Sequence, residues 1–157
     1  MKNFIKLQKA LADHEYLLHG SPERIKGALK PKKSYDEAKE GGNKTGVYST
    51  SNAVIAIWKG VAHKKDKKRR WMVGWSWNDN GEKVLYGKNI KLKNGYVYIL
   101  PSEDFRPITG DASDHVSLIP ISPTATIKVS PKDLLELQKE MGFVIEIDSV
   151  RALLAHI

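Results

Sequence analysis

The sequence predicts a mixed α+β fold with mainly antiparallel strands. Three β-rich stretches, residues 71–77, 83–88 and 95–101, follow one another with only short turns between them, an order typical of antiparallel pairing. Helical patterns lie near both ends of the chain and after residue 52. At 157 residues, with no internal repeat and no linker-like stretch, the chain is expected to form a single domain, 1–157, around one core.

The first third of the chain alternates helical segments with short strands. Phe4, Leu7 and Leu11 recur at helical spacing and predict a short amphipathic helix. The stretch LLHGSP at 17–22 brings a strand into a turn-forming group, and the polar, glycine-bearing segment 30–46 predicts a loop. The other elements expected here are a strand at 16–18, one or two helical turns at 22–28 with Pro22 first, a strand at 47–50, and a helix carrying Ala53 to Ile57 that is capped by Asn52 or Ser51.

The last third contains the strongest helix signal. Ser130, Pro131, Asp133 and Gly142 occupy the N-cap, first-turn and C-terminal positions that favour those residue types, so a helix is expected between them. Aromatic residues alternate along the preceding strands and are interpreted as core. These residues are Tyr96, Tyr98, Trp71, Trp75 and Trp77, and the remaining expected elements are strands within 115–122, 124–130 and 143–147 and a terminal helix at 148–157.

The positive charge is concentrated in one stretch. The chain contains 26 Lys and Arg against 18 Asp and Glu, a formal net charge of +8, and residues 59–70 (KGVAHKKDKKRR) hold seven of those cations and one Asp. Such a run forms either a solvated loop or a patch that contacts phosphates. A phosphate-contacting patch predicts the alternative function, a non-catalytic nucleic-acid-binding or interaction module. The residues that would contact nucleic acid are Lys64, Lys65, Lys67, Lys68, Arg69 and Arg70.

Other features argue against several classes of function. The chain has no cysteine, and its five histidines form no HExxH motif, so neither a disulfide framework nor a metal site is expected. There is no GxGxxG, and the stretch GGNKTG lacks the glycines of a phosphate-binding loop because Ala38 and Asn43 stand in their places. Lysines at 2, 6 and 9 interrupt any signal-peptide apolar region, and no apolar run is long enough to cross a membrane. A cytoplasmic protein without membrane contact is therefore expected.

Three stretches, in this order, resemble the ADP-ribosyltransferase superfamily. They are LLHGSP followed by IKGALKP, GVYSTSNAVIAIW, and GYVYILPSEDFRP followed by SDHVSLIPISP. The first two resemble the H and Y elements of the histidine–tyrosine–carboxylate subclass, in the manner of the small rifampin ADP-ribosyltransferases and of short phage or bacterial proteins of that type. The resemblance covers residues 16–130, and the N-terminal helix and the C-terminal helix–strand–helix extension lie outside it.

This resemblance implies a fold and an activity. The fold is an ADP-ribosyltransferase-like split antiparallel β-sandwich with an NAD cleft and flanking helices. The activity is transfer of ADP-ribose from NAD to an acceptor, which the sequence leaves open as a protein, a nucleic acid or a small molecule. Transfer breaks the nicotinamide–ribose bond through a positively charged, oxocarbenium-like state, so the protein has to position NAD and offset that charge.

The resemblance also implies roles for particular residues. His19 would hydrogen-bond a ribose hydroxyl, the Gly20 backbone would approach the carboxamide closely, and Tyr48 would stack on the nicotinamide ring. His19 and Tyr48 are therefore expected on neighbouring strands, facing one cleft. The implied catalytic residues are His19, Tyr48 and Asp114, and the implied NAD-binding residues are His19, Gly20, Ser21, Tyr48, Ser49 and Thr50.

Each of these roles has a structural alternative. His19 could be a strand-end histidine in a hydrogen-bonded turn, and Tyr48 could be an inward core residue. A carboxylate should lead the strand that begins near residue 116, and Asp114 stands there, in agreement with the aspartate of rifampin-type members. If no carboxylate points into the cleft, only binding of an NAD-like ligand remains. The other candidates for this position are Asp111, His115 and Ser117.

Overall fold

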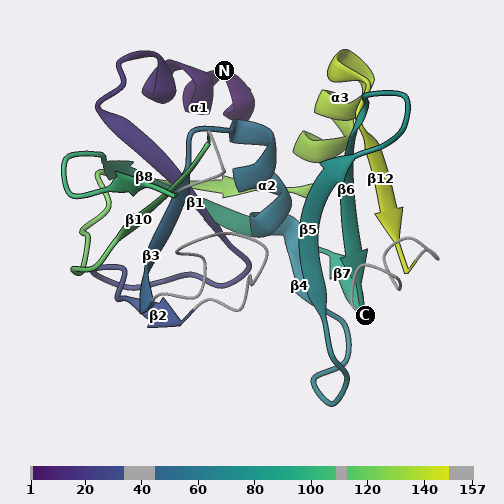
Figure 1. Ribbon diagram of the computed structural model, residues 1–157, viewed down its shortest axis with the longest axis horizontal. Helices are drawn as coiled ribbons and strands as arrows, with labels where there is room; N and C mark the ends of the chain where they lie inside the picture. The colour runs from purple at the N-terminus through teal and green to yellow at the C-terminus, as the bar shows by residue number, and fades with distance from the viewer. Residues whose placement is uncertain (1, 34–44, 109–112, 149–157) are drawn as a thin grey trace.

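The structure is a computed structural model that describes residues 2–33, 45–108 and 113–148 (Figure 1). As the sequence predicts, it is a mixed α+β architecture with mostly antiparallel strands, and three helices lie in the described part of the chain. The helices are α1 (Asn3–Ala12), α2 (Ala53–Val61) and α3 (Pro131–Met141). The strands are β1 (Tyr16–Ser21), β2 (Lys32–Lys33), β3 (Thr45–Thr50), β4 (Ala62–Lys64), β5 (Met72–Trp77), β6 (Lys83–Lys88), β7 (Ile90–Leu92), β8 (Gly95–Pro101), β9 (Arg106–Pro107), β10 (Asp114–Ser117), β11 (Ala125–Val129) and β12 (Val144–Ile147).

Two sheets dominate the fold. The larger has the strand order β11-β8-β1-β3-β10-β9, with β2 on the edge of β3, and every pairing in it is antiparallel. The smaller has the order β12-β6-β5, and its β12 runs parallel to β6. A separate antiparallel pair, β4 with β7, continues directly from α2. The segment 89–94, predicted as a turn, therefore contains a short strand.

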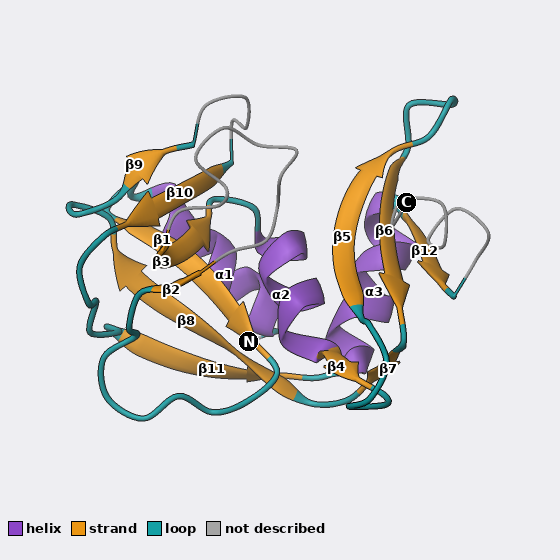
Figure 2. Ribbon diagram, turned by 60° about the horizontal axis from the view of Figure 1, so that its bottom comes forward, coloured by secondary structure: helices purple, strands orange, loops and turns teal. Residues whose placement is uncertain are grey.

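Helix α2 lies between the two sheets and forms the centre of the core (Figure 2). Every residue in it except Lys59 is buried, as expected for a helix that is apolar all round. Asn52 is its N-cap: the side chain accepts a hydrogen bond from the backbone N–H of Ile55 at 3.1 Å. Trp58 is fully buried and donates its indole N–H to the carbonyl of Gly74 in β5 at 3.0 Å, which ties the helix to the smaller sheet.

A second apolar layer covers the opposite face of the larger sheet. Leu17, Tyr98 and Leu100 face it from β1 and β8, and Leu29 and Ile121 close over them. The central strands β1 and β8 of the large sheet are thus covered on both faces, by α2 on one side and by loop segments on the other. The expected core role of Tyr98 is confirmed, since its side chain is fully buried.

The helical turns predicted at 22–28 are absent. The hydroxyl of Ser21 instead donates to the carbonyl of Glu23 at 2.9 Å, and the backbone N–H of Ile25 donates to the hydroxyl of Tyr98 at 2.5 Å. These contacts hold the segment to β8, and they replace the local i to i+4 bonds of a helix. The residues of 22–28 alone could not predict this conformation, because the partner Tyr98 lies far away in the sequence.

Other boundaries also differ from expectation. The strand predicted within 115–122 ends at Ser117, whose hydroxyl donates to the carbonyl of Ile119 at 3.1 Å and so forms a turn. Trp71 and Trp77 are 43% and 58% exposed, so only Trp75 of the three packs against the core. Helix α3 is confirmed, with Ser130 and residue 133 forming a reciprocal capping box. The expected terminal helix at 148–157 falls almost entirely outside the described residues.

Candidate functional site

The larger sheet divides between β1 and β3. The two strands are neighbours, as the sequence predicts, but they pair only at Leu18 and Thr50. Further along, β2 takes over the free edge of β3, where Lys32 pairs with Gly46. From residue 19 onward β1 and β3 are no longer paired, and we call the unpaired stretch between them the split.

Backbone polar groups of β1 point into the split. The N–H of Ser51 donates to the carbonyl of Ser113 at 2.9 Å, so odd-numbered residues of this segment face β10 and even-numbered ones face β1. Since Leu18 pairs with Thr50, the same alternation directs the N–H and C=O of Gly20 toward β3. Pairing has ended there, so this polar edge faces the split.

His19 reaches across the split with its side chain. Its Nδ1 lies 2.5 Å from the carbonyl oxygen of Tyr48, and because a carbonyl only accepts, Nδ1 carries the proton. Burial lowers the pKa of His19 to about 4; the bond to Tyr48 opposes this shift, and the charges of Lys59 and Lys32 add to it. At neutral pH the ring is therefore uncharged. Its Nε2 is an acceptor, and no residue in the described part of the chain hydrogen-bonds to it.

The expectation that His19 and Tyr48 face one cleft is wrong. Tyr48 and Thr50 alternate with Ser49 along β3, and Thr50 shares the face of Leu18, which packs toward α2. His19, the next residue after Leu18, points to the other face. The two side chains come from neighbouring strands but lie on opposite sides of the sheet.

The remaining predicted NAD-binding residues have structural contacts of their own. A Cβ on Gly20 would lie 2.0 Å from the carbonyl oxygen of Ala56, so close packing of α2 already requires glycine there. The hydroxyl of Ser21 bonds within the turn at 21–23, and that of Thr50 accepts from the N–H of Asn52 at 3.0 Å. The hydroxyl of Ser49 differs, because it is buried without a hydrogen-bond partner among the described residues.

Asp114 begins β10 and is buried. It pairs with Thr50 across β3–β10, so its side chain shares the α2 face with Tyr48 and lies opposite to His19. Of the three residues implied to be catalytic, Tyr48 and Asp114 therefore lie on the α2 face of the sheet and His19 lies on the opposite face. His115 lies on the face of His19, with Nδ1 3.0 Å from the carbonyl of Ser113. Asp111, the second candidate carboxylate, lies outside the described residues.

Two features of this region were missed by sequence reasoning. Lys32 and Lys59 lie close enough to His19 for their charges to lower its pKa, although they belong to β2 and α2. A hollow of about 380 Å³ opens near the start of β1, between His14, His115 and Ser102. None of the residues implied to be catalytic lines it. Neither feature has a local sequence signal, since each combines segments that only the fold brings together.

The basic stretch 59–70 is divided by the fold. Lys59 lies in α2 beside the split and Lys64 ends β4, whereas the cations of 65–70 are exposed in the loop that follows. Among the described residues, no three His, Asp or Glu side chains gather closely enough to hold a metal ion. No helix within the same residues is long and apolar enough to cross a membrane.

No family model, no curated protein and no solved structure matches this chain. The fold and the site define it as a mixed α+β protein in whose main antiparallel sheet the pairing of two neighbouring strands stops, with a neutral histidine placed across the unpaired stretch.

Proposed function

We propose that the chain binds NAD at the split and transfers its ADP-ribose to an acceptor. The observation that carries the proposal is the state of His19. The bond from Nδ1 to the Tyr48 carbonyl fixes the tautomer, so Nε2 offers a lone pair to a hydroxyl group. A ribose hydroxyl is such a donor, and the resemblance of the sequence to ADP-ribosyltransferases implies the same contact.

The surroundings of His19 suit the rest of the ligand. A primary carboxamide carries both an N–H donor and a C=O acceptor, which complement the N–H and C=O that Gly20 directs into the split. Lys32 and Lys59 lie close enough to His19 for their charges to lower its pKa, and the same charges would attract the two phosphates of NAD. The contact that we assign to Gly20 is thus made by its backbone, while the missing side chain serves the packing of α2.

The transfer step requires a negative charge near the ribose that loses nicotinamide. We assign it to Asp114, which shares its face of the sheet with Tyr48. Asp114 lies on β10, on the far side of β3 from the split and on the face opposite to His19, so its charge would act on the ribose across β3 rather than through direct contact. Stabilisation of the developing cation by a carboxylate acts mainly in the transition state.

Nicotinamide release from NAD, measured with and without candidate acceptors, tests this proposal together with calorimetric NAD binding. Asp114→Asn should slow release by about 10²–10³ with little change in binding. His19→Ala should weaken NAD binding as well, because a ribose contact acts in ground and transition states alike. His63→Ala is the matched control, since it removes an imidazole from β4, outside the sheet that contains the split, and it should leave both quantities unchanged.

A wild-type chain that neither binds nor consumes NAD would refute the proposal. Binding of nucleic acid by such a chain would favour the alternative, a non-catalytic module. Full activity in Asp114→Asn would remove Asp114 from the mechanism and direct attention to Asp111.

A further inference from the structure

The basic loop, residues 64–70, is a dense cluster of cations that the proposed NAD site does not use: six of its seven residues are Lys or Arg. Its only acidic residue is Asp66, and that carboxylate is engaged within the loop. One oxygen accepts the backbone N–H of Lys68 at 2.9 Å, and the other lies 3.5 Å from Nε of Arg69. Asp66 therefore shapes the loop and leaves most of its cations directed to solvent.

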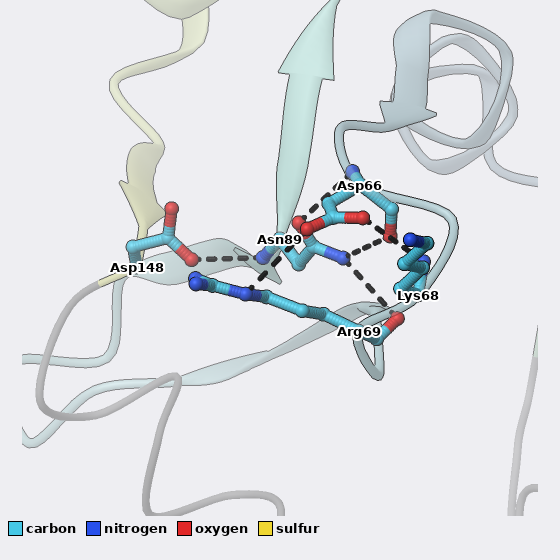
Figure 3. A network of polar contacts seen from close by, with 5 residues as sticks. All are labelled: Asp66, Lys68, Arg69, Asn89 and Asp148. Atoms are coloured by element: carbon cyan, nitrogen blue, oxygen red, sulfur yellow. Dashed lines mark hydrogen bonds and ion pairs between the residues drawn. The ribbon is translucent and has the colours of Figure 1, made fainter.

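Asn89 fixes the backbone of this loop through a network of hydrogen bonds (Figure 3). Its side-chain N–H groups donate to the carbonyls of Asp66 at 2.8 Å and Arg69 at 3.3 Å, and its Oδ1 accepts from the N–H of Asp66 at 3.1 Å. Its own carbonyl accepts from the N–H of Lys65 at 2.9 Å, and its N–H donates to the carboxylate of Asp148 at 2.8 Å. A loop held at so many points loses little conformational entropy when a ligand binds.

Lysines from a second segment extend the patch. Strand β7 pairs with β4, which places Lys91 opposite His63 and brings Lys93 near as well. Contact with Lys93, and after it the charge of Lys65, lowers the pKa of Lys91, so these ammonium groups lie close together. In the described part of the chain, no carboxylate forms an ion pair with Lys91 or Lys93.

We propose that the basic loop, with Lys91, Lys93 and Trp71, binds single-stranded nucleic acid. Cations gathered with one carboxylate, Asp66, among them suit a chain of phosphates. Trp71 follows the loop directly and is 43% exposed, which leaves its ring available to stack on an unpaired base. The surface has a single exposed apolar side chain, Trp71, whereas a membrane-binding segment buries several on one face, which favours nucleic acid over an anionic membrane. The inference does not depend on NAD binding.

Fluorescence anisotropy of a labelled oligothymidylate, titrated over a series of salt concentrations, tests this surface. The variant Lys65→Ser, Lys67→Ser, Lys68→Ser should bind at least about tenfold more weakly at low salt, and the slope of log affinity against log salt should flatten by about 2. A control with the same net charge replaces three exposed lysines elsewhere, Lys6, Lys9 and Lys26, by serine and should bind as the wild type does. Equal losses in the two variants would reduce the effect to net charge and overturn the proposal.

Trp71→Ala tests the choice of single strands. It should weaken binding of the oligothymidylate by about fivefold or more and leave binding of a duplex of the same length unchanged. Trp71→Phe should restore part of the loss. An unchanged single-strand affinity in Trp71→Ala would overturn the single-strand assignment, and binding to phosphatidylserine vesicles without binding to the oligonucleotide would overturn the whole proposal.

Discussion

Replacement of Gly20 by alanine separates two explanations of this glycine. If its role is to let NAD approach, the variant should fold normally and lose only ligand binding. The structure gives a different expectation, because an added Cβ would lie 2.0 Å from the carbonyl oxygen of Ala56 and 2.9 Å from the backbone nitrogen of Gly60. We therefore expect Gly20→Ala to destabilise the fold itself, in the absence of any ligand.

The magnitude follows from what has to move. Contacts of a real Cβ shorter than 3.0 Å essentially never occur, so β1 and α2 would have to separate by about 1 Å at this point. Overpacking of a core costs about 1–3 kcal/mol when neighbours can adjust, and here the obstacle is the backbone of a helix buried between two sheets. We expect a loss of about 3 kcal/mol or more, which for a chain of this length lowers the melting temperature by about 6–12 °C.

Equilibrium unfolding in urea, without NAD, measures this loss. Gly81→Ala is the matched control: its φ is +77°, but nothing lies within 4 Å of the added Cβ, so only the backbone cost of about 1 kcal/mol applies. If Gly20→Ala is no less stable than Gly81→Ala, the close approach of β1 and α2 is not what requires glycine at this position. NAD binding would then be its explanation.

Three further changes have expected outcomes. Burial lowers the pKa of His19 from 6.5 to about 4, so as the pH falls His19 is protonated in the unfolded chain before it is protonated in the folded one. The contribution of this group to the free energy of unfolding should therefore be constant above pH 6.5 and fall by about 2–3 kcal/mol as the pH drops toward 4. Urea unfolding of His19→Gln across this range should show a shallower fall, and an equally steep one would contradict the shift. Asn89→Ala should lower stability by about 2–3 kcal/mol in thermal unfolding, since it removes buried hydrogen bonds at a φ of 56°, and Asn89→Gly should recover about 1 kcal/mol by relieving the backbone. Ser130→Ala should cost about 1 kcal/mol through loss of the α3 cap; no change would mean that the capping box contributes nothing measurable.

The sequence predicted those elements whose signals are local. Helix α3 is an example, because Ser130, Pro131 and Gly142 act on the backbone beside them whatever the rest of the fold does. Strands β5, β6 and β8 were equally predictable from the sequence, since aromatic and β-branched residues concentrate in them between short turns. The pairing of β1 with β3 was also expected, although only from the order of two motifs.

The arrangement of the candidate site was not predictable in the same way. Whether His19 and Tyr48 share a face depends on the register between their strands, and a shift of one residue reverses the answer. No pattern within either strand reports that register. The approach of Lys32 and Lys59 to His19 was equally unpredictable, since each of these residues comes from a different element of the fold.

The position of α2 has a consequence for how the molecule opens. Neither sheet can move away from α2 without exposing one side of this helix. Trp58 is hydrogen-bonded to β5, while Ala56 and Gly60 lie against β1. The amide protons of α2 should therefore exchange with solvent only when the whole molecule unfolds, and their protection should equal the global free energy of unfolding. Those of the basic loop, which lies outside this layer, should exchange through smaller openings. A hydrogen-exchange map would then show one slow-exchanging segment, 53–61, shared by two sheets that are otherwise separate.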